Sequence, residues 1–103
     1  MIEIAIPDTI KIGGFNYTIL HNKDKDIELY DNVVFGTHSA MLRRIELKTD
    51  SPPQQKSLTF IHECLHAIDD IYLCQQIKSD ILIDGLANGL LQLFEQLGVR
   101  FVK

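Results

Sequence analysis

The sequence of 103 residues has little cysteine, no excess of positive charge and no long apolar run. Lysine and arginine number 10 against 14 acidic residues, and the formal net charge of −4 gives a nucleic-acid-binding role no electrostatic support. No apolar stretch approaches the roughly 20 residues that a membrane-spanning helix needs. The first residues lack the basic start and apolar core of a secretion signal. We therefore expect a cytoplasmic protein that binds neither nucleic acid nor membrane.

Cys64 and Cys74 are the only cysteines, and both fall in one expected helix. Their separation along a helix is about 15 Å, which a disulfide bond cannot span. Two free thiols are typical of a reducing compartment and agree with a cytoplasmic location. The length fits one small domain over residues 1–103, and the sequence has neither an internal repeat nor a low-complexity tract.

Residues 1–50 are rich in strand patterns. Gly13 and Gly14 stand between alternating apolar residues, so residues 9–20 are expected to form a hairpin with a two-residue turn. The other expected segments are a charged loop at 22–26, a short helix or strand at 27–31, and strands at 33–37 and 44–48.

Residues 51–98 carry two helical patterns. The first helix is expected to have Ser51 as its N-cap and Pro52 at its first position. The second is expected to begin at Ser79 and to end at Gly98. Apolar residues that recur at spacings of three and four, and should face the core, are Leu58, Ile61, Leu65, Ile68 and Tyr72 in the first helix and Leu82, Leu86, Leu90, Leu93 and Leu97 in the second.

These segments predict an α+β fold in which a small antiparallel or mixed sheet of about three to four strands packs on two long helices. The tail at residues 99–103 is apolar. It is expected either to close the fold as a strand or to fold back over a groove.

Residues 62–66 read His-Glu-Cys-Leu-His, which is the H-E-x-x-H pattern. On a helix this spacing places the imidazoles of His62 and His66 on one face, within reach of a single Zn²⁺ at about 2.0–2.1 Å. Both lie at the rim of the apolar stripe, and Glu63 can take a proton from a zinc-activated water. The pattern predicts a zinc-dependent hydrolase, most of all a peptidase. The alternative is a chance pair of partly buried histidines beside a surface glutamate.

A catalytic zinc site usually has three protein ligands and a water. Tyr72 occupies the position where an extended pattern has a third histidine, and the remaining histidines, His21 and His38, fall in strand or loop regions. Asp80 and Asp84, one turn apart on the second helix, are the better candidates. One would bind zinc while the other accepts a hydrogen bond from a ligand histidine. The alternative for both is an ordinary acidic residue of the helix, at Asp80 one favoured near the helix start.

Four further residues have two interpretations each. Asp69 either orients His66 or is solvated. His38 is either a transition-state donor or an ordinary loop histidine. Tyr30 and Tyr72 either polarise a substrate carbonyl or pack at the rim of the core.

Residues 62–66, followed on the next helix by Asp80-x-x-x-Asp84, resemble the gluzincin class of zinc metallopeptidases. The small size and the run Leu-Ala-Asn-Gly-Leu at 86–90 resemble its minimal phage- and prophage-encoded members, the minigluzincins. The resemblance covers roughly residues 35–97 and implies a minimal zincin-like scaffold.

The resemblance also implies roles. His62 and His66 match the metal ligands and Glu63 the general base. Asp84 matches an aspartate that supports a ligand histidine, and Asp80 stands where the family has a metal-binding glutamate. Because aspartate is shorter by one methylene, about 1.5 Å, an intact site, a weakened site and an inactive scaffold all stay open.

The function implied is hydrolysis of a peptide bond in a peptide or protein substrate by a zinc-activated water, in an active or latent form. The strand at 44–48 would be the edge strand that binds an extended peptide through its main chain. The alternatives are a catalytically inactive zincin-like scaffold and an interaction protein of prophage origin. The sequence leaves the oligomeric state open.

Overall fold

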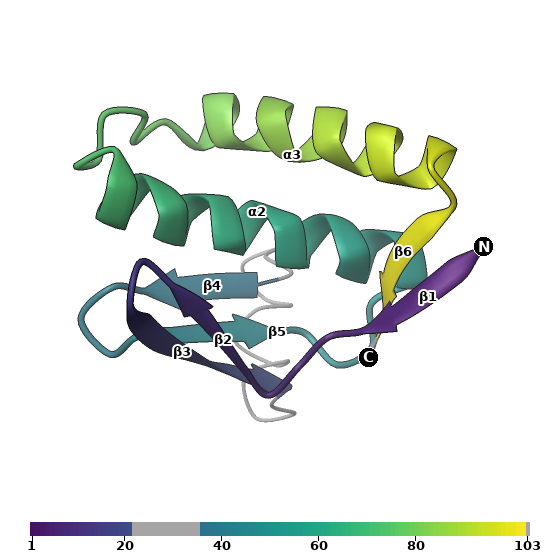
Figure 1. Ribbon diagram of the computed structural model, residues 1–103, viewed down its shortest axis with the longest axis horizontal. Helices are drawn as coiled ribbons and strands as arrows, with labels where there is room; N and C mark the ends of the chain where they lie inside the picture. The colour runs from purple at the N-terminus through teal and green to yellow at the C-terminus, as the bar shows by residue number, and fades with distance from the viewer. Residues whose placement is uncertain (22–35, 103) are drawn as a thin grey trace.

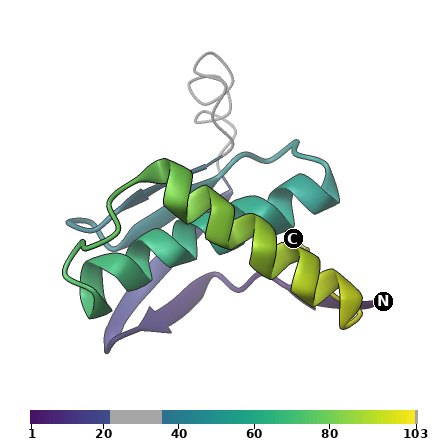
Figure 2. The same ribbon diagram turned by 90° about the horizontal axis from the view of Figure 1, so that it is seen from above.

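The computed structural model describes residues 1–21 and 36–102. Within these residues the fold is α+β, with a four-stranded mixed sheet, a two-stranded parallel sheet and two long helices. The four-stranded sheet, helix α2 (Pro53–Tyr72) and helix α3 (Asp80–Gln96) form successive layers (Figure 1), and α3 crosses α2 obliquely (Figure 2). The predicted fold class is confirmed.

The four-stranded sheet has the order β2–β3–β5–β4. Its strands are β2 (Thr9–Ile12), β3 (Phe15–His21), β4 (Gly36–Ser39) and β5 (Arg44–Leu47). Strand β5 runs parallel to β3 and antiparallel to β4. The prediction that residues 44–48 form the edge strand is therefore wrong. After β4 the chain turns and returns as β5, which lies between β4 and β3. Among the described residues, β4 is the edge.

The hairpin predicted at residues 9–20 is confirmed. Ile12 pairs with Phe15 across the turn, and Gly13 and Gly14 have φ angles of 61° and 89°. Of the strand predicted at 33–37, only its last two residues are described, and they begin β4. The loop and the short segment predicted at 22–26 and 27–31 lie outside the described residues.

Helix α2 begins one residue later than predicted, at Pro53, and no side chain caps it. Because a residue before proline is disfavoured in the helical region, Pro52 takes an extended ψ of 152° instead of starting the helix. Ser51 donates its hydroxyl to the carbonyl of Lys48 over 3.3 Å. The two prolines in succession therefore displace the start of the helix from the predicted N-cap, Ser51.

Helix α2 lies between two layers and buries two sides. Toward α3 it places Ile61, with Leu58 and Leu65 half-buried beside it, but the predicted stripe residues Ile68 and Tyr72 are exposed. The side toward the sheet was not predicted, and it consists of Phe60, Cys64, Ala67 and Ile71.

Helix α3 has the predicted boundaries. The Ser79 hydroxyl accepts a hydrogen bond from the backbone N–H of Leu82 at 3.4 Å, and Gly98 follows the helix with a φ of 78°. The predicted core stripe is wrong, because Leu82, Leu86, Leu93 and Leu97 are exposed and Leu90 is half-buried. The buried residues are Ile83, Ala87 and Leu91. Apolar residues occupy two adjacent sides of α3, so periodicity alone does not identify the side that contacts α2.

The tail forms strand β6 (Val99–Val102), which pairs in parallel with β1 (Ile2–Ala5). The tail is thus a closing strand and not a cover for a groove. Phe101 contacts the rings of Phe60 and Phe94, with centroids 5.4 and 5.7 Å apart, and joins the two sides of the core.

Both cysteines are free, as predicted, but they do not share a helix. Cys74 lies beyond the end of α2, exposed in the connection to α3, with a φ of 49°. No helix within residues 1–21 and 36–102 has the length and apolar character needed to cross a bilayer.

Candidate metal centre

Helix α2 brings two imidazoles together opposite strand β4. His62 and His66 are one helical turn apart, and their Nε2 atoms lie 3.2 Å from each other. Their side chains are 21% and 14% exposed. This is the rim position expected from the apolar pattern, from which both rings can reach the same ligand.

Asp80, the first residue of α3, supplies a carboxylate at the same point. Its Oδ1 lies 2.8 Å from Nε2 of His66 and 3.8 Å from Nε2 of His62. With the 3.2 Å between the nitrogens, these three atoms lie on a circle of about 1.9 Å radius. Three ligands of a tetrahedral zinc ion, bound at about 2.0–2.1 Å, lie on a circle of about 1.9–2.0 Å. The donor set and its spacing therefore fit zinc.

Asp84, one turn further along α3, approaches the other nitrogen of the first histidine. Its Oδ1 lies 3.5 Å from Nδ1 of His62. A carboxylate in this position favours a proton on Nδ1 and leaves the lone pair of Nε2 free to bind a metal ion. Of the two aspartates, Asp80 thus has the geometry of a metal ligand, and Asp84 that of a group supporting the ligand His62.

Asp69 explains how the start of α3 reaches the histidines. Its buried carboxylate accepts hydrogen bonds from the backbone N–H groups of Ile77 and Lys78, at 3.0 and 3.1 Å. Asp69 is therefore not solvated, and its hydrogen bonds go to the connection between the helices instead of to His66. The anchored connection places Asp80 directly after it.

Glu63 forms a group with His62 and His66 whose side chains could hold a metal ion. It is 6% exposed, and a carboxylate oxygen lies within 4.8 Å of a nitrogen of each histidine. Burial, and to a smaller extent the negative charge of Asp80, together raise the pKa of Glu63 from 4.5 to about 7. A carboxyl group with this pKa can accept and return a proton near neutrality.

His66 is kept neutral by its surroundings. Burial lowers its pKa, and the neighbouring imidazoles of His38 and His62 act in the same direction, whereas Asp80 opposes them. Neutral imidazole is the form that binds a metal ion.

His38 on β4, for which the sequence left a transition-state donor and an ordinary loop histidine open, lies beside His66. Its ring stacks on that of His66, with centroids 4.9 Å apart and planes inclined by 6°. Its Nε2 lies 2.9 Å from Oδ2 of Asp70. His38 is thus no ordinary loop histidine, since it connects the edge strand to α2 and to a candidate ligand.

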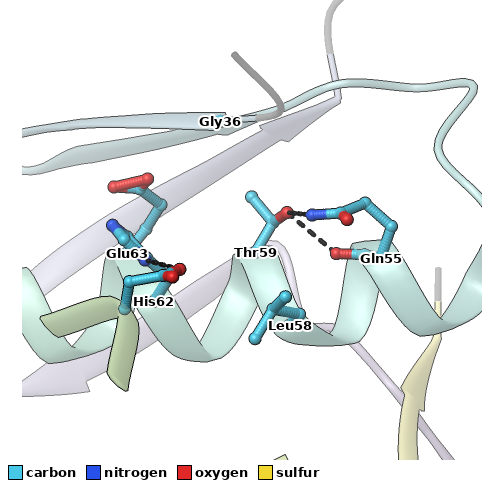
Figure 3. A pocket seen from close by; sticks show the side chains of 7 residues that line it. Gly36, Gln55, Leu58, Thr59, His62 and Glu63 are labelled. Carbon is cyan, nitrogen blue, oxygen red and sulfur yellow. Dashed lines mark hydrogen bonds and ion pairs between the residues drawn. The ribbon is translucent and has the colours of Figure 1, made fainter. Parts of the chain in front are cut away.

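Two hollows lie along α2, on either side of the triangle formed by Nε2 of His62, Nε2 of His66 and Oδ1 of Asp80. One of about 240 Å³ is lined by Gly36 of β4 and by Gln55, Thr59 and Glu63 of α2 (Figure 3). The other, of about 510 Å³, is lined by His38, His66, Asp70 and Asp80, among others. Because β4 contributes to both, the edge strand borders the whole site.

The remaining sequence candidates lie elsewhere. Tyr72 is exposed and His21 ends strand β3, and neither lines these two hollows. Tyr30 lies outside the described residues.

Comparison of the chain with protein-family models, with curated proteins and with solved structures gave no match.

Proposed function

We propose that this protein is a zinc-dependent metallopeptidase with His62, His66 and Asp80 as metal ligands. The observation that carries the proposal is the triangle of two imidazole nitrogens and one carboxylate oxygen, beside a buried glutamate with a raised pKa. The resemblance of residues 62–66 and Asp80-x-x-x-Asp84 to the gluzincins, and to the minigluzincins by size, supports the same reaction.

Zinc bound there would supply a Lewis acid that acidifies a water molecule and polarises the scissile carbonyl. Glu63 takes the proton from the attacking water on its carboxylate and delivers it to the leaving amine. Asp84 holds His62 in the tautomer that presents Nε2.

The substrate we propose is an extended peptide or protein segment lying along β4. Among the described residues, β4 pairs on one side only, with β5, so its other edge offers main-chain donors and acceptors to a peptide. Gly36 and His38 of this strand border the two hollows, which gives side chains of the substrate a place on either side of the proposed metal ligands.

Zinc content and cleavage of an unfolded protein substrate test this proposal together. The wild type should bind one zinc per chain and cleave, and Glu63→Gln should keep the zinc and lose cleavage by at least about a hundredfold, the low end of a general base's contribution. Glu3→Gln, which changes an exposed carboxylate of β1, is the matched control and should leave cleavage unchanged. Equal cleavage by the Glu63→Gln variant would exclude the mechanism.

A second candidate is a zinc-binding scaffold or interaction protein without catalysis. It is favoured by the side chain of Asp80, which is shorter than glutamate and 83% exposed. Stoichiometric zinc without turnover in the wild type would select it. In either case we propose a cytoplasmic protein of prophage origin, because both thiols are free and the resemblance is to phage- and prophage-encoded proteins.

A further inference from the structure

The outer side of α3 is an apolar surface that nothing in the described structure covers. Leu82, Leu86, Leu93 and Leu97 are 48–67% exposed and lie within about 60° of one another around the helix axis. We call these four residues the α3 leucine face. They lie next to, and not within, the side of α3 that packs on α2, which consists of Ile83, Ala87 and Leu91.

The leucine face is also uncharged along its length. The charged residues of α3 are Asp80, Asp84 and Glu95, and none of the ten residues between Asp84 and Glu95 is charged. An exposed helix side is ordinarily polar and charged, and an apolar patch of this kind marks a contact surface.

The spacing of the four leucines reads the same in both directions along the helix. In an antiparallel pair of α3 helices with a twofold axis between Gly89 and Leu90, Leu82 stands opposite Leu97 of the second copy. Leu86 stands opposite Leu93 in the same way. A twofold interface requires such self-complementarity, because one surface must match itself.

The two glycines of α3 leave room for this approach. A methyl group added at Gly85 or Gly89 would meet nothing within 4 Å. Interior glycines cost about 1 kcal/mol each in an isolated helix, and no packing within the described structure requires either of them. At the centre of a paired helix they would let Leu90 of a second copy come close to the backbone.

The area agrees with a weak dimer. The exposed fractions of the four leucines amount to just over two whole side chains per copy. At up to about 120 Å² of apolar surface for each, two copies would cover about 540 Å². Since about 65% of a homodimer interface is apolar, the full interface would be about 800 Å², in the range of weak and transient contacts.

We propose that two copies of this chain associate through the leucine faces of antiparallel α3 helices. A membrane surface is a poorer occupant, because interfacial helices carry lysine and arginine on their polar side and α3 has only acidic residues there. The proposal does not depend on the metal site, to which α3 contributes Asp80 and Asp84 and not the leucines.

The test is the mass of the protein in solution over a range of concentrations, by light scattering or sedimentation with a chelator present. The chelator removes dimers bridged by metal through His62 and His66. The mass should rise reversibly from 11.8 kDa toward twice that value. A mass that stays at 11.8 kDa at every concentration overturns the proposal, as does binding to lipid vesicles without self-association.

Two double variants test the antiparallel register. L86K/L93K places like charges opposite each other and should abolish the dimer, whereas L86E/L93K removes the same leucines but places opposite charges together and should retain more of it. L42K, at an exposed leucine in the turn before β5, is the control and should dimerise like the wild type. Dimerisation of L86K/L93K, or equal loss in both double variants, overturns the proposed pairing. Circular dichroism identifies any variant that fails to fold, and in that case the wild-type mass decides.

Discussion

The Nε2 atom of His38, on the edge strand, lies 2.9 Å from Oδ2 of Asp70 in the last turn of α2. Because the His38 ring also stacks on His66, this contact connects the edge strand, the central helix and a candidate zinc ligand in one unit. Groups that orient a ligand from outside the metal's first coordination sphere commonly change metal affinity by about 10–100-fold when removed.

The first prediction concerns this unit. Asp70→Asn removes the carboxylate that holds His38, so the imidazole stacked on His66 becomes free to turn. We expect zinc affinity to fall by about tenfold, measured by competition with a chromophoric chelator. His38→Phe retains a flat ring against His66 and should lose less affinity than His38→Ala. Equal affinities for all three variants and the wild type would show that the unit does not support the metal.

The second prediction separates the two aspartates of α3. Asp80 approaches both Nε2 atoms and Asp84 approaches only Nδ1 of His62. Asp80→Asn should therefore weaken zinc binding more than Asp84→Asn, whose loss should stay within about 10–100-fold. The same chelator competition measures both. A larger loss of zinc affinity in Asp84→Asn would show that Asp84 is the ligand and Asp80 the supporting group.

The third prediction is a pH dependence of stability in the metal-free protein. The folded state holds the Glu63 proton up to about pH 7, whereas the unfolded chain releases it near 4.5. Between these values the folded state binds more protons, so the free energy of unfolding falls as the pH rises, by at most about 3 kcal/mol.

Urea unfolding at pH 4.5, 6 and 7.5 in a chelator measures this effect. The quantity to compare is the difference between wild type and Glu63→Gln, because titration of His66 affects both proteins alike. The variant should gain stability relative to the wild type as the pH rises. A constant difference across the three pH values would contradict a raised pKa for Glu63.

The fourth prediction concerns the thiols. Burial, with the nearby charge of Glu63, raises the pKa of Cys64 to about 12, whereas Cys74 is exposed. Because the thiolate is the reactive form, iodoacetamide at pH 8 should modify the native protein once, at Cys74. Mass spectrometry of the wild type and of Cys74→Ser checks this. Rapid modification of the variant would show that Cys64 is accessible and ionised.

The fifth prediction addresses the close contact between β4 and α2. A Cβ atom at Gly36 would lie 2.5 Å from Cγ2 of Thr59 and 3.0 Å from the carbonyl oxygen of Glu46. Gly36→Ala should therefore lower the free energy of unfolding by about 1–3 kcal/mol. Thr59→Ser removes Cγ2 and keeps the hydroxyl, so the double variant should recover part of the loss. If the double variant recovers no free energy of unfolding, the contact with Thr59 is not the source of the strain.

Local patterns were enough to predict several elements. Gly13 and Gly14 identified the hairpin, Ser79 and Gly98 identified the bounds of α3, and the spacing of His62 and His66 predicted that their rings would meet. Each of these depends on residues within a few positions of one another, where backbone geometry dominates.

Features set by the layering of the fold were not predictable in the same way. The side of α3 that is buried depends on the contact of Ala87 with α2, and two sides of this helix are apolar enough to serve. The stacking of His38 on His66 joins a strand and a helix that are far apart in sequence. The edge position of β4 follows from a parallel pairing of β3 with β5 that no local pattern specifies.

The parallel pairing of Ile2 with Val99 joins segments from opposite ends of the described chain. Contacts over such separations form slowly, because a long loop must close first. Since Phe101 of β6 contacts both Phe60 and Phe94, this strand also fixes α3 on α2. During synthesis on a ribosome, the histidine pair of α2 can therefore form while the helix carrying Asp80 is still unanchored. If the proposed site holds a metal ion, a nascent chain would bind that ion through the two histidines alone, and Asp80 would complete the site only after the closing strand has emerged.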